Sequence, residues 1–139
     1  TVKKLNWLPD IIHIHGWVSA LLPLYLRTYY KDEPIFSESK IITSVFDSDY
    51  DGALDSALIN KVAFDGISKK TIDPLKNPTY YNLMRIAIKH SDGVIVVSEK
   101  MPDDFKTYLK NLRKPVIYNS DKETFQESYR EFYTKILKK

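Results

Sequence analysis

The sequence predicts an α/β protein in which a parallel sheet carries helices on both faces. Three largely apolar, β-branched runs of strand length occur at residues 11–15, 41–46 and 94–97, and segments with the apolar spacing of amphipathic helices lie between them. Runs without polar alternation are typical of strands that are buried on both faces. Such strands alternating with helices predict a parallel sheet, whose ligands bind beyond the carboxyl ends of the strands.

The first half of the chain is punctuated by glycine and proline. Gly16 ends the first strand, and Pro23 lies inside the following helix stripe, where it predicts a kink or a short frayed first turn. Pro34 marks a polar loop before the second strand. The predicted elements are a strand at 11–15, a helix at 18–29, a loop at 31–39, a strand at 40–46, an acidic loop at 47–52, a weak helix at 53–62 and an irregular segment at 64–73.

Helix-capping signals organise the second half. Asn77 is predicted as an N-cap with Pro78 at the first helical position, and Ser120 and Glu123 have the spacing of a capping box before the last helix. The predicted elements are a helix from 78 to about Asp92, a strand at 94–97, a helix at 102–112, a strand at 116–118 and a last helix at 120–139. The last helix carries an apolar stripe made of Phe125, Tyr129, Phe132, Tyr133, Ile136 and Leu137.

Length and composition limit the classes of protein. The 139 residues fit one domain, so we expect residues 1–139 to form a single α/β domain. Hydrophobic residues make up 43% of the chain and the net charge is +3, which argues against disorder and against nucleic acid or a membrane surface as a partner. The absence of cysteine excludes disulfides and thiolate metal sites. With neither a membrane-length apolar run nor a signal peptide, the sequence predicts a cytoplasmic protein, and because it lacks an initiator methionine we expect it to begin inside a longer chain.

Two histidines mark the first strand. His13 and His15 are two residues apart, so their side chains share one face, but two histidines without cysteine are too few ligands for a zinc site. We expect His13 to be a buried imidazole bonded to the backbone. His15 is the last strand residue and is a candidate for function. Gly16 before Trp17 is expected to open a helix whose amides could receive an anion, and Trp17 is either a sugar-stacking platform or part of the core.

The acidic loop at residues 47–52 resembles the start of a calcium loop. Asp47, Asp49, Asp51 and Gly52 fit the motif, but the twelfth position is Leu58, where a bidentate glutamate should complete the coordination sphere. We therefore expect no metal site, and we interpret the loop as a solvated acidic turn whose carboxylates could also bind sugar hydroxyls. A small calcium-responsive module is kept as a third hypothesis for the function.

The segment from residue 4 to residue 26 resembles glycogen and starch synthases, a family of retaining glucosyltransferases with two facing Rossmann-like domains (the GT-B fold). Their first domain carries a phrase like P-D-V-V-H-x-H-D-W, followed by A-L-x-P-x-Y-L. The matching residues here are Pro9, Asp10, His13, His15, Trp17, Ala20, Leu21, Pro23, Tyr25 and Leu26. A weaker similarity continues to about Glu99 and includes Tyr50, Gly52, Asp92 and Ser98.

The resemblance implies a fold and a function. Residues 1–139 would be the later half of the N-terminal domain of a synthase that transfers glucose from ADP-glucose or UDP-glucose to an α-1,4-glucan. It implies a catalytic role near the transferred glucose for His15, substrate-binding roles for Gly16, Trp17, Asp47 and Tyr50, and no cofactor. The family's K-x-G-G segment and second domain are not in this sequence, so we expect the isolated chain to be inactive.

The sequence also departs from the family at particular positions. Gly16 stands where most members have Asp, and Phe46-Asp47 replaces His-Asn. These substitutions motivate the alternative hypothesis, a non-catalytic glucan-binding or scaffolding module derived from the same fold. An incomplete sheet would expose a strand edge, so we also expect a tendency to form homo-oligomers.

Overall fold

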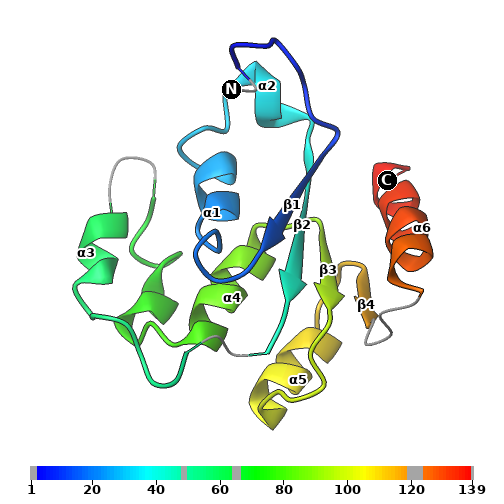
Figure 1. The fold of residues 1–139 in the computed structure, drawn as a ribbon. Coiled ribbons are helices and arrows are strands. Elements are labelled where there is room, and N and C mark those ends of the chain that lie inside the picture. The colour runs from blue at the N-terminus through cyan, green and yellow to red at the C-terminus, as the bar shows by residue number, and fades with distance from the viewer. Residues whose placement is uncertain (1–2, 48–49, 64–66, 119–123, 139) are drawn as a thin grey trace.

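The four strands of the protein form one parallel sheet. The computed structural model describes residues 3–47, 50–63, 67–118 and 124–138. The strands are β1 (Ile11–His15), β2 (Lys40–Val45), β3 (Gly93–Val96) and β4 (Val116–Tyr118), and they follow one another across the sheet in chain order (Figure 1). All three strand pairs are parallel, so the predicted parallel α/β fold is confirmed.

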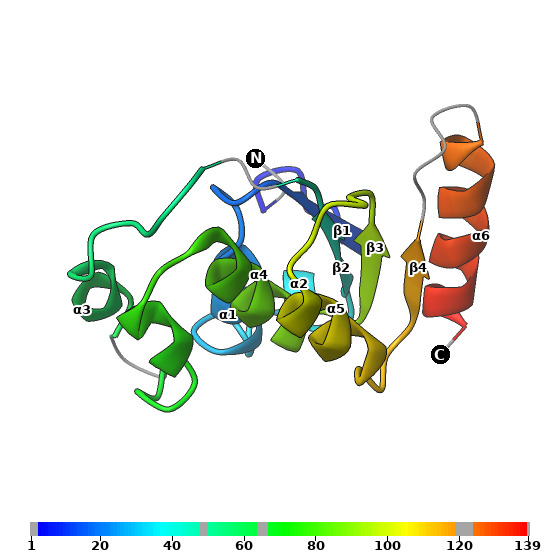
Figure 2. The same cartoon turned by 90° about the horizontal axis from the view of Figure 1, so that it is seen from below.

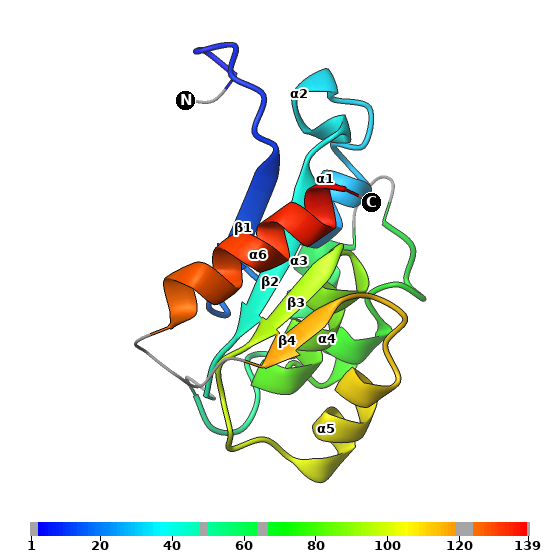
Figure 3. The same ribbon diagram turned by 90° about the vertical axis from the view of Figure 1, so that its right-hand side faces the viewer.

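Helices cover both faces of the sheet. The helices α1 (Leu22–Arg27), α4 (Tyr80–Lys89) and α5 (Asp103–Lys110) lie on one face, and α6 (Phe125–Leu137) lies alone on the other (Figure 2). Each strand is added on the same side of its predecessor, and right-handed crossovers then place the connecting helices on a single face. Figure 3 shows α6 lying across the opposite face, which it reaches after the last strand.

The core has one large and two small parts, and one of the small parts joins Ile14 of β1, Ile41 of β2 and Leu26 of α1. The large cluster lies between the sheet and α1, α4 and α5, and its largest fully buried side chains include Tyr80, Phe105, Leu24 and Met84. On the other face, Phe132 and Ile136 of α6 bury Ile42 of β2 and Ile95 of β3. Because side chains alternate along a strand, the residues of β1 that share the α6 face are Ile11, His13 and His15.

Several predicted boundaries were wrong. The first helix begins at Leu22 rather than at residue 18, with Pro23 in its first turn, where a proline needs no amide partner. The predicted loop before β2 contains a short helix, α2 (Pro34–Ser37). The weak helix shrinks to α3 (Leu58–Val62), and the irregular segment is followed by a 3-10 turn, η1 (Asp73–Lys76).

The cap of α4 also differs from the prediction. Thr79, not Asn77, is the N-cap: its backbone is extended and its side chain accepts a hydrogen bond from the Asn82 amide at 3.3 Å. Asn77 instead ends η1, and its carbonyl accepts a hydrogen bond from the Asn82 side chain at 2.7 Å. Both residues are good caps in isolation, and the turn of η1 decides between them. The predicted capping box of Ser120 and Glu123 lies outside the described residues.

A lysine closes the carboxyl end of α4. Lys114 Nζ donates to the carbonyls of Ile88 at 2.7 Å, Lys89 at 3.2 Å and Ser91 at 2.6 Å. These carbonyls lie at the negative end of the helix, where a cation is favoured. Burial lowers the pKa of Lys114, and the nearby Asp92 partly opposes this effect.

Lys114→Met is therefore expected to lower the free energy of unfolding by about 1–2 kcal/mol, because three partly buried carbonyls lose their donor. Urea unfolding followed by circular dichroism measures the change. Lys31→Met removes an exposed lysine of a loop and is the matched control. An equal loss in both variants would mean that Lys114 acts only through net charge.

Candidate functional site

The carboxyl ends of the parallel strands meet at one edge of the sheet, as predicted. His15 ends β1, Phe46 and Asp47 follow β2, and Val97 and Ser98 follow β3. In open parallel sheets this edge is where ligands bind. The edge therefore holds two of the residues proposed from the sequence, His15 and Asp47, and the others follow directly in the loops.

His15 is exposed at the end of β1 and is held between two rings. Its ring centroid lies 4.0 Å from that of His13 and 6.0 Å from that of Phe46. The backbone turn behind it is fastened by Ser19, whose hydroxyl donates to the His15 carbonyl at 2.6 Å. The imidazole is thus oriented by neighbouring rings while its edge stays open to solvent, which suits a group that donates a hydrogen bond to a ligand.

His13 supports His15 from within the protein. Its Nδ1 is hydrogen-bonded to the hydroxyl of Tyr133 on α6, and its Nε2 lies 2.6 Å from the hydroxyl of Ser44 on β2. The expected backbone bond was therefore wrong, because the neighbouring strand and α6 each supply a hydroxyl. Burial, and to a smaller extent the adjacent His15, lower the pKa of His13 to about 4. His13 is therefore neutral at neutral pH, and its two hydrogen bonds hold its ring in a fixed position beside His15.

The predicted anion site behind Gly16 is not present. Gly16 has φ of 72°, a left-handed conformation that glycine adopts without strain and that turns the chain out of β1. The next helix begins only at Leu22 and has six residues, so the amides after Gly16 do not form a helix N-terminus. The predicted anion site required a helix that begins at Gly16, because its anion would bind to the free amides at the helix N-terminus.

Trp17 and Tyr50 lie together beside the large core. Their ring centroids are 5.2 Å apart with the planes at 71°, and both side chains are half-buried. The Tyr50 hydroxyl donates to the Pro78 carbonyl at 3.1 Å, which ties the acidic loop to the start of α4. Burial raises the pKa of Tyr50. Of the two readings of Trp17, the structure shows the packing against the core, with part of the ring exposed.

Asp47 is linked to the next strand through Ser98. The buried Ser98 hydroxyl is hydrogen-bonded to Asp47 Oδ1, while the Asp47 side chain is exposed. The same hydroxyl accepts from the Lys100 amide at 3.2 Å. A pocket of about 340 Å³ begins at Ser98 and continues past Met101 to Tyr118, at the ends of β3 and β4. Small-molecule pockets fall in the range of about 300–1,000 Å³.

The proposed site residues thus form three separate groups. His15 lies with His13 and Phe46, Trp17 with Tyr50, and Asp47 with Ser98. Sequence reasoning missed the support that α6 gives to His13, because no local pattern shows which strand a helix stripe will cover. Ser98 was indicated by the sequence, since it directly follows the predicted strand at 94–97 and is one of the residues that match the family.

Within the described residues, no three His, Cys, Asp or Glu side chains gather in a way that could hold a metal ion. Asp49 of the calcium-like loop lies outside the described residues, so the loop itself stays untested. In the part of the chain that the structure describes, no helix has the length and apolar character needed to cross a bilayer.

Comparison with known proteins identifies the family. The family described as starch synthase catalytic domain matches residues 1–115, which include β1, β2, β3 and the strand-end residues above. The chain belongs to this family. Similar curated proteins include glycogen synthases of Thermotoga petrophila (32% identical over 108 residues, 76% of this chain), Geotalea uraniireducens (32% over 114 residues, 82% of this chain) and Clostridium perfringens (26% over 121 residues, 83% of this chain).

This chain covers only part of the length of its relatives. The chain spans 22% of the length of each of these three glycogen synthases. β4 and α6 follow the matched residues, so the helix that supports His13 lies beyond the family match. No solved structure matches this chain.

Proposed function

We propose that this chain forms part of a retaining glucosyltransferase of the glycogen and starch synthase type. Its substrates would be a sugar nucleotide, ADP-glucose or UDP-glucose, and the end of an α-1,4-glucan. The observation that carries the proposal is the exposed His15 imidazole at the carboxyl end of β1, inside the family match and on the same sheet edge as Asp47. The cytoplasmic location and homo-oligomer formation stay predictions.

The reaction breaks the bond between glucose C1 and the diphosphate oxygen and joins C1 to a hydroxyl oxygen of the glucan, while the hydroxyl proton leaves with the diphosphate. Positive charge develops on the sugar ring in such a transition state. His15 would donate a hydrogen bond to the transferred glucose, and neutral His13 behind it adds no competing charge. The exposed Asp47 carboxylate would accept bonds from acceptor hydroxyls, with Gly16, Trp17 and Tyr50 lining the acceptor path.

The first test of the proposal is glucan binding by the 139-residue chain. In an amide NMR titration with maltoheptaose, we expect shifts confined to residues 13–17, 46–52 and 97–100. Asp47→Ala should weaken binding about tenfold, which corresponds to the loss of one good hydrogen bond to an acceptor hydroxyl. Asp32→Ala is the matched control, because Asp32 is an exposed aspartate in the loop before α2 and should leave glucan affinity unchanged.

The second test is turnover. We expect the isolated chain to bind glucan without transferring glucose, and His15→Ala in the longest natural protein that contains the chain to lower kcat about 100-fold or more. Absence of shifts with maltoheptaose would contradict the proposal, as would full activity of His15→Ala. The alternative of a non-catalytic glucan-binding module is not favoured, because the similar proteins are named glycogen synthases. A parent protein that binds glucan but transfers no glucose would revive it.

A further inference from the structure

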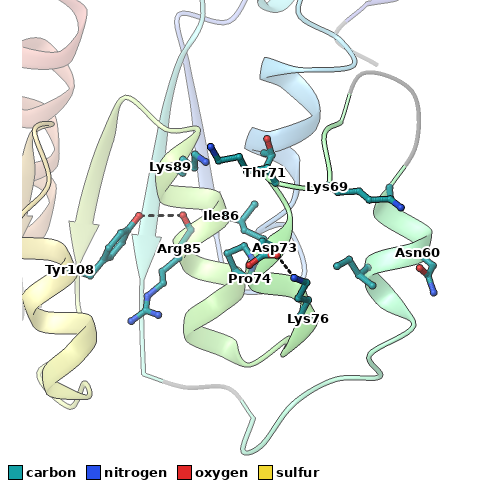
Figure 4. Close-up of a pocket in the computed structure, with 13 residues that line it drawn as sticks. Asn60, Lys69, Thr71, Asp73, Pro74, Lys76, Arg85, Ile86, Lys89 and Tyr108 are labelled. Carbon is teal, nitrogen blue, oxygen red and sulfur yellow. Dashed lines mark hydrogen bonds and ion pairs between the residues drawn. The ribbon is translucent and has the colours of Figure 1, made fainter.

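A second cavity lies on the helical face of the protein, away from the strand ends. It has a volume of about 790 Å³ and is enclosed by α3, η1, α4 and α5 (Figure 4). None of the residues proposed above for glucan transfer lines it. Its volume falls within the range of small-molecule sites, about 300–1,000 Å³.

The wall of this cavity is strongly cationic. Among the lining residues, five carry a positive charge and one, Asp73, carries a carboxylate. The cationic residues are Lys69, Lys70, Lys76, Arg85 and Lys89. The carboxylate is already used, because Asp73 Oδ1 lies 2.5 Å from Lys76 Nζ. The residues that line the cavity therefore carry a net positive charge.

Three of these cations have no counter-ion in the described parts of the chain. Arg85 is paired outside the wall with Asp104 at 2.7 Å, whereas none of the described residues forms an ion pair with Lys69, Lys70 or Lys89. Like charges around one cavity repel each other, and an anion inside it would offset that repulsion. Arg85 Nε is in addition a buried donor without an acceptor among the described residues.

The rest of the wall is apolar. Ile59 from α3, Ala63 directly after α3, Pro74 from η1 and Ile86 from α4 line it between the charges. Tyr108 from α5 closes one side, with its hydroxyl donating to the Arg85 carbonyl at 3.4 Å (Figure 4). An inorganic anion would use the lysines alone, whereas a ligand with an organic part would also cover this apolar surface.

We propose that this cavity binds a small phosphate ester, with the phosphate attracted by the positive charge of Lys69, Lys70 and Lys89 and the organic part against Ile59 and Ile86. A phosphate monoester carries a charge of about −1.5 to −2 at neutral pH, and lysine binds phosphate as a point charge. Sugar phosphates and nucleotides share this chemistry. The inference does not rest on the proposed glucan transfer, because it uses no residue of the strand ends.

The test is an amide NMR titration of the 139-residue chain with three probes: inorganic phosphate, glucose 1-phosphate and AMP. We expect shifts in α3, η1 and α4, with at least one ester binding about tenfold more tightly than inorganic phosphate because of the apolar contact. The ester that binds more tightly identifies the organic part as sugar or nucleoside. Equal affinity for all three probes would overturn the assignment to an ester, and no shifts up to about 10 mM would overturn the site.

A pair of charge-matched variants separates a site from general attraction. The pocket variant combines Lys69→Gln, Lys70→Gln and Lys89→Gln. The control variant combines Lys31→Gln, Lys135→Gln and Lys138→Gln, all exposed and outside the cavity. We expect the pocket variant to lose about tenfold in affinity for the ester and the control less than about twofold, since exposed distant charges are screened. Equal losses in the two variants would overturn the proposal. We expect both variants to bind maltoheptaose as the wild type does, so this result is independent of the test of glucan transfer.

Discussion

Gly93→Val is expected to lower the free energy of unfolding by about 2–3 kcal/mol and to displace α6 from the sheet. A Cβ atom at Gly93 would lie 2.8 Å from Ile136 Cδ1 and 2.9 Å from Phe132 Cζ, closer than packed atoms allow. Gly93 is the first residue of β3, so the helix rests directly on the strand backbone. Urea unfolding measures the loss, and the amide shifts of α6 report whether the helix has moved.

A double-mutant cycle tests the cause of this effect. Ile136→Val removes Cδ1, the nearest of the atoms that a new Cβ would meet. Gly93→Ala should therefore cost less in the Ile136→Val protein than in the wild type, by about 0.5 kcal/mol or more. Additive losses would show that Gly93 is needed for its backbone conformation instead, and an unchanged stability of Gly93→Val would contradict the docking of α6 on β3.

Stability is expected to fall as the pH is lowered from about 6.5 to about 4, with His13 as a main cause. The pKa of His13 in the folded protein is about 4, below the ordinary histidine value of 6.5 that applies in the unfolded chain. Between these values the unfolded chain binds a proton that the folded protein does not, so acid favours unfolding. Because the imidazole is only half-buried, solvent screens part of this effect. We therefore expect His13 to contribute about 1–2 kcal/mol to the pH-dependent free energy of unfolding.

The pH effect is measured by urea unfolding at a series of pH values and by NMR titration of the imidazole. His13→Asn should flatten the curve in this window. Burial also lowers the pKa of His90, so His90→Gln should remove a smaller part and leave the His13 contribution in place. A His13 imidazole that titrates near pH 6.5 in the folded protein would contradict the burial of this ring under α6.

The pH prediction also concerns the strand-end site. Protonation of His13 would place a positive charge beside His15, whose ring centroid is 4.0 Å away. Tyr133 and Tyr129 pack on His13 from α6, with ring centroids at 5.7 and 5.8 Å. α6, which follows the residues matched by the family, thus shields the His13 imidazole partly from water and keeps it neutral. It does so from the face of the sheet, whereas His15 lies at the edge of the sheet.

Local patterns were enough for the elements that build the sheet. The β-branched run before Gly16, the run at β2 and the short strand Val116–Tyr118 were predicted from residue type alone, because β-branched and aromatic residues favour strands. The placement of His15 and Asp47 at one edge followed from parallel topology. The residues from Pro9 to Trp17 that match the family's motif are close together in the sequence, so the resemblance could be seen without a structure. The family comparison confirms the family.

Contacts between distant segments decided the rest. The start of α4 at Thr79 depends on η1, and the partners of His13 come from residues 44 and 133, far along the chain. The cationic cavity joins lysines from a loop and two helices, which no local spacing could have brought together. The sequence by itself determined the four strands and the helices other than the short α2, because burial periodicity is local. Only the tertiary structure decided which polar groups meet, because hydrogen bonds and charges depend on how those segments pack.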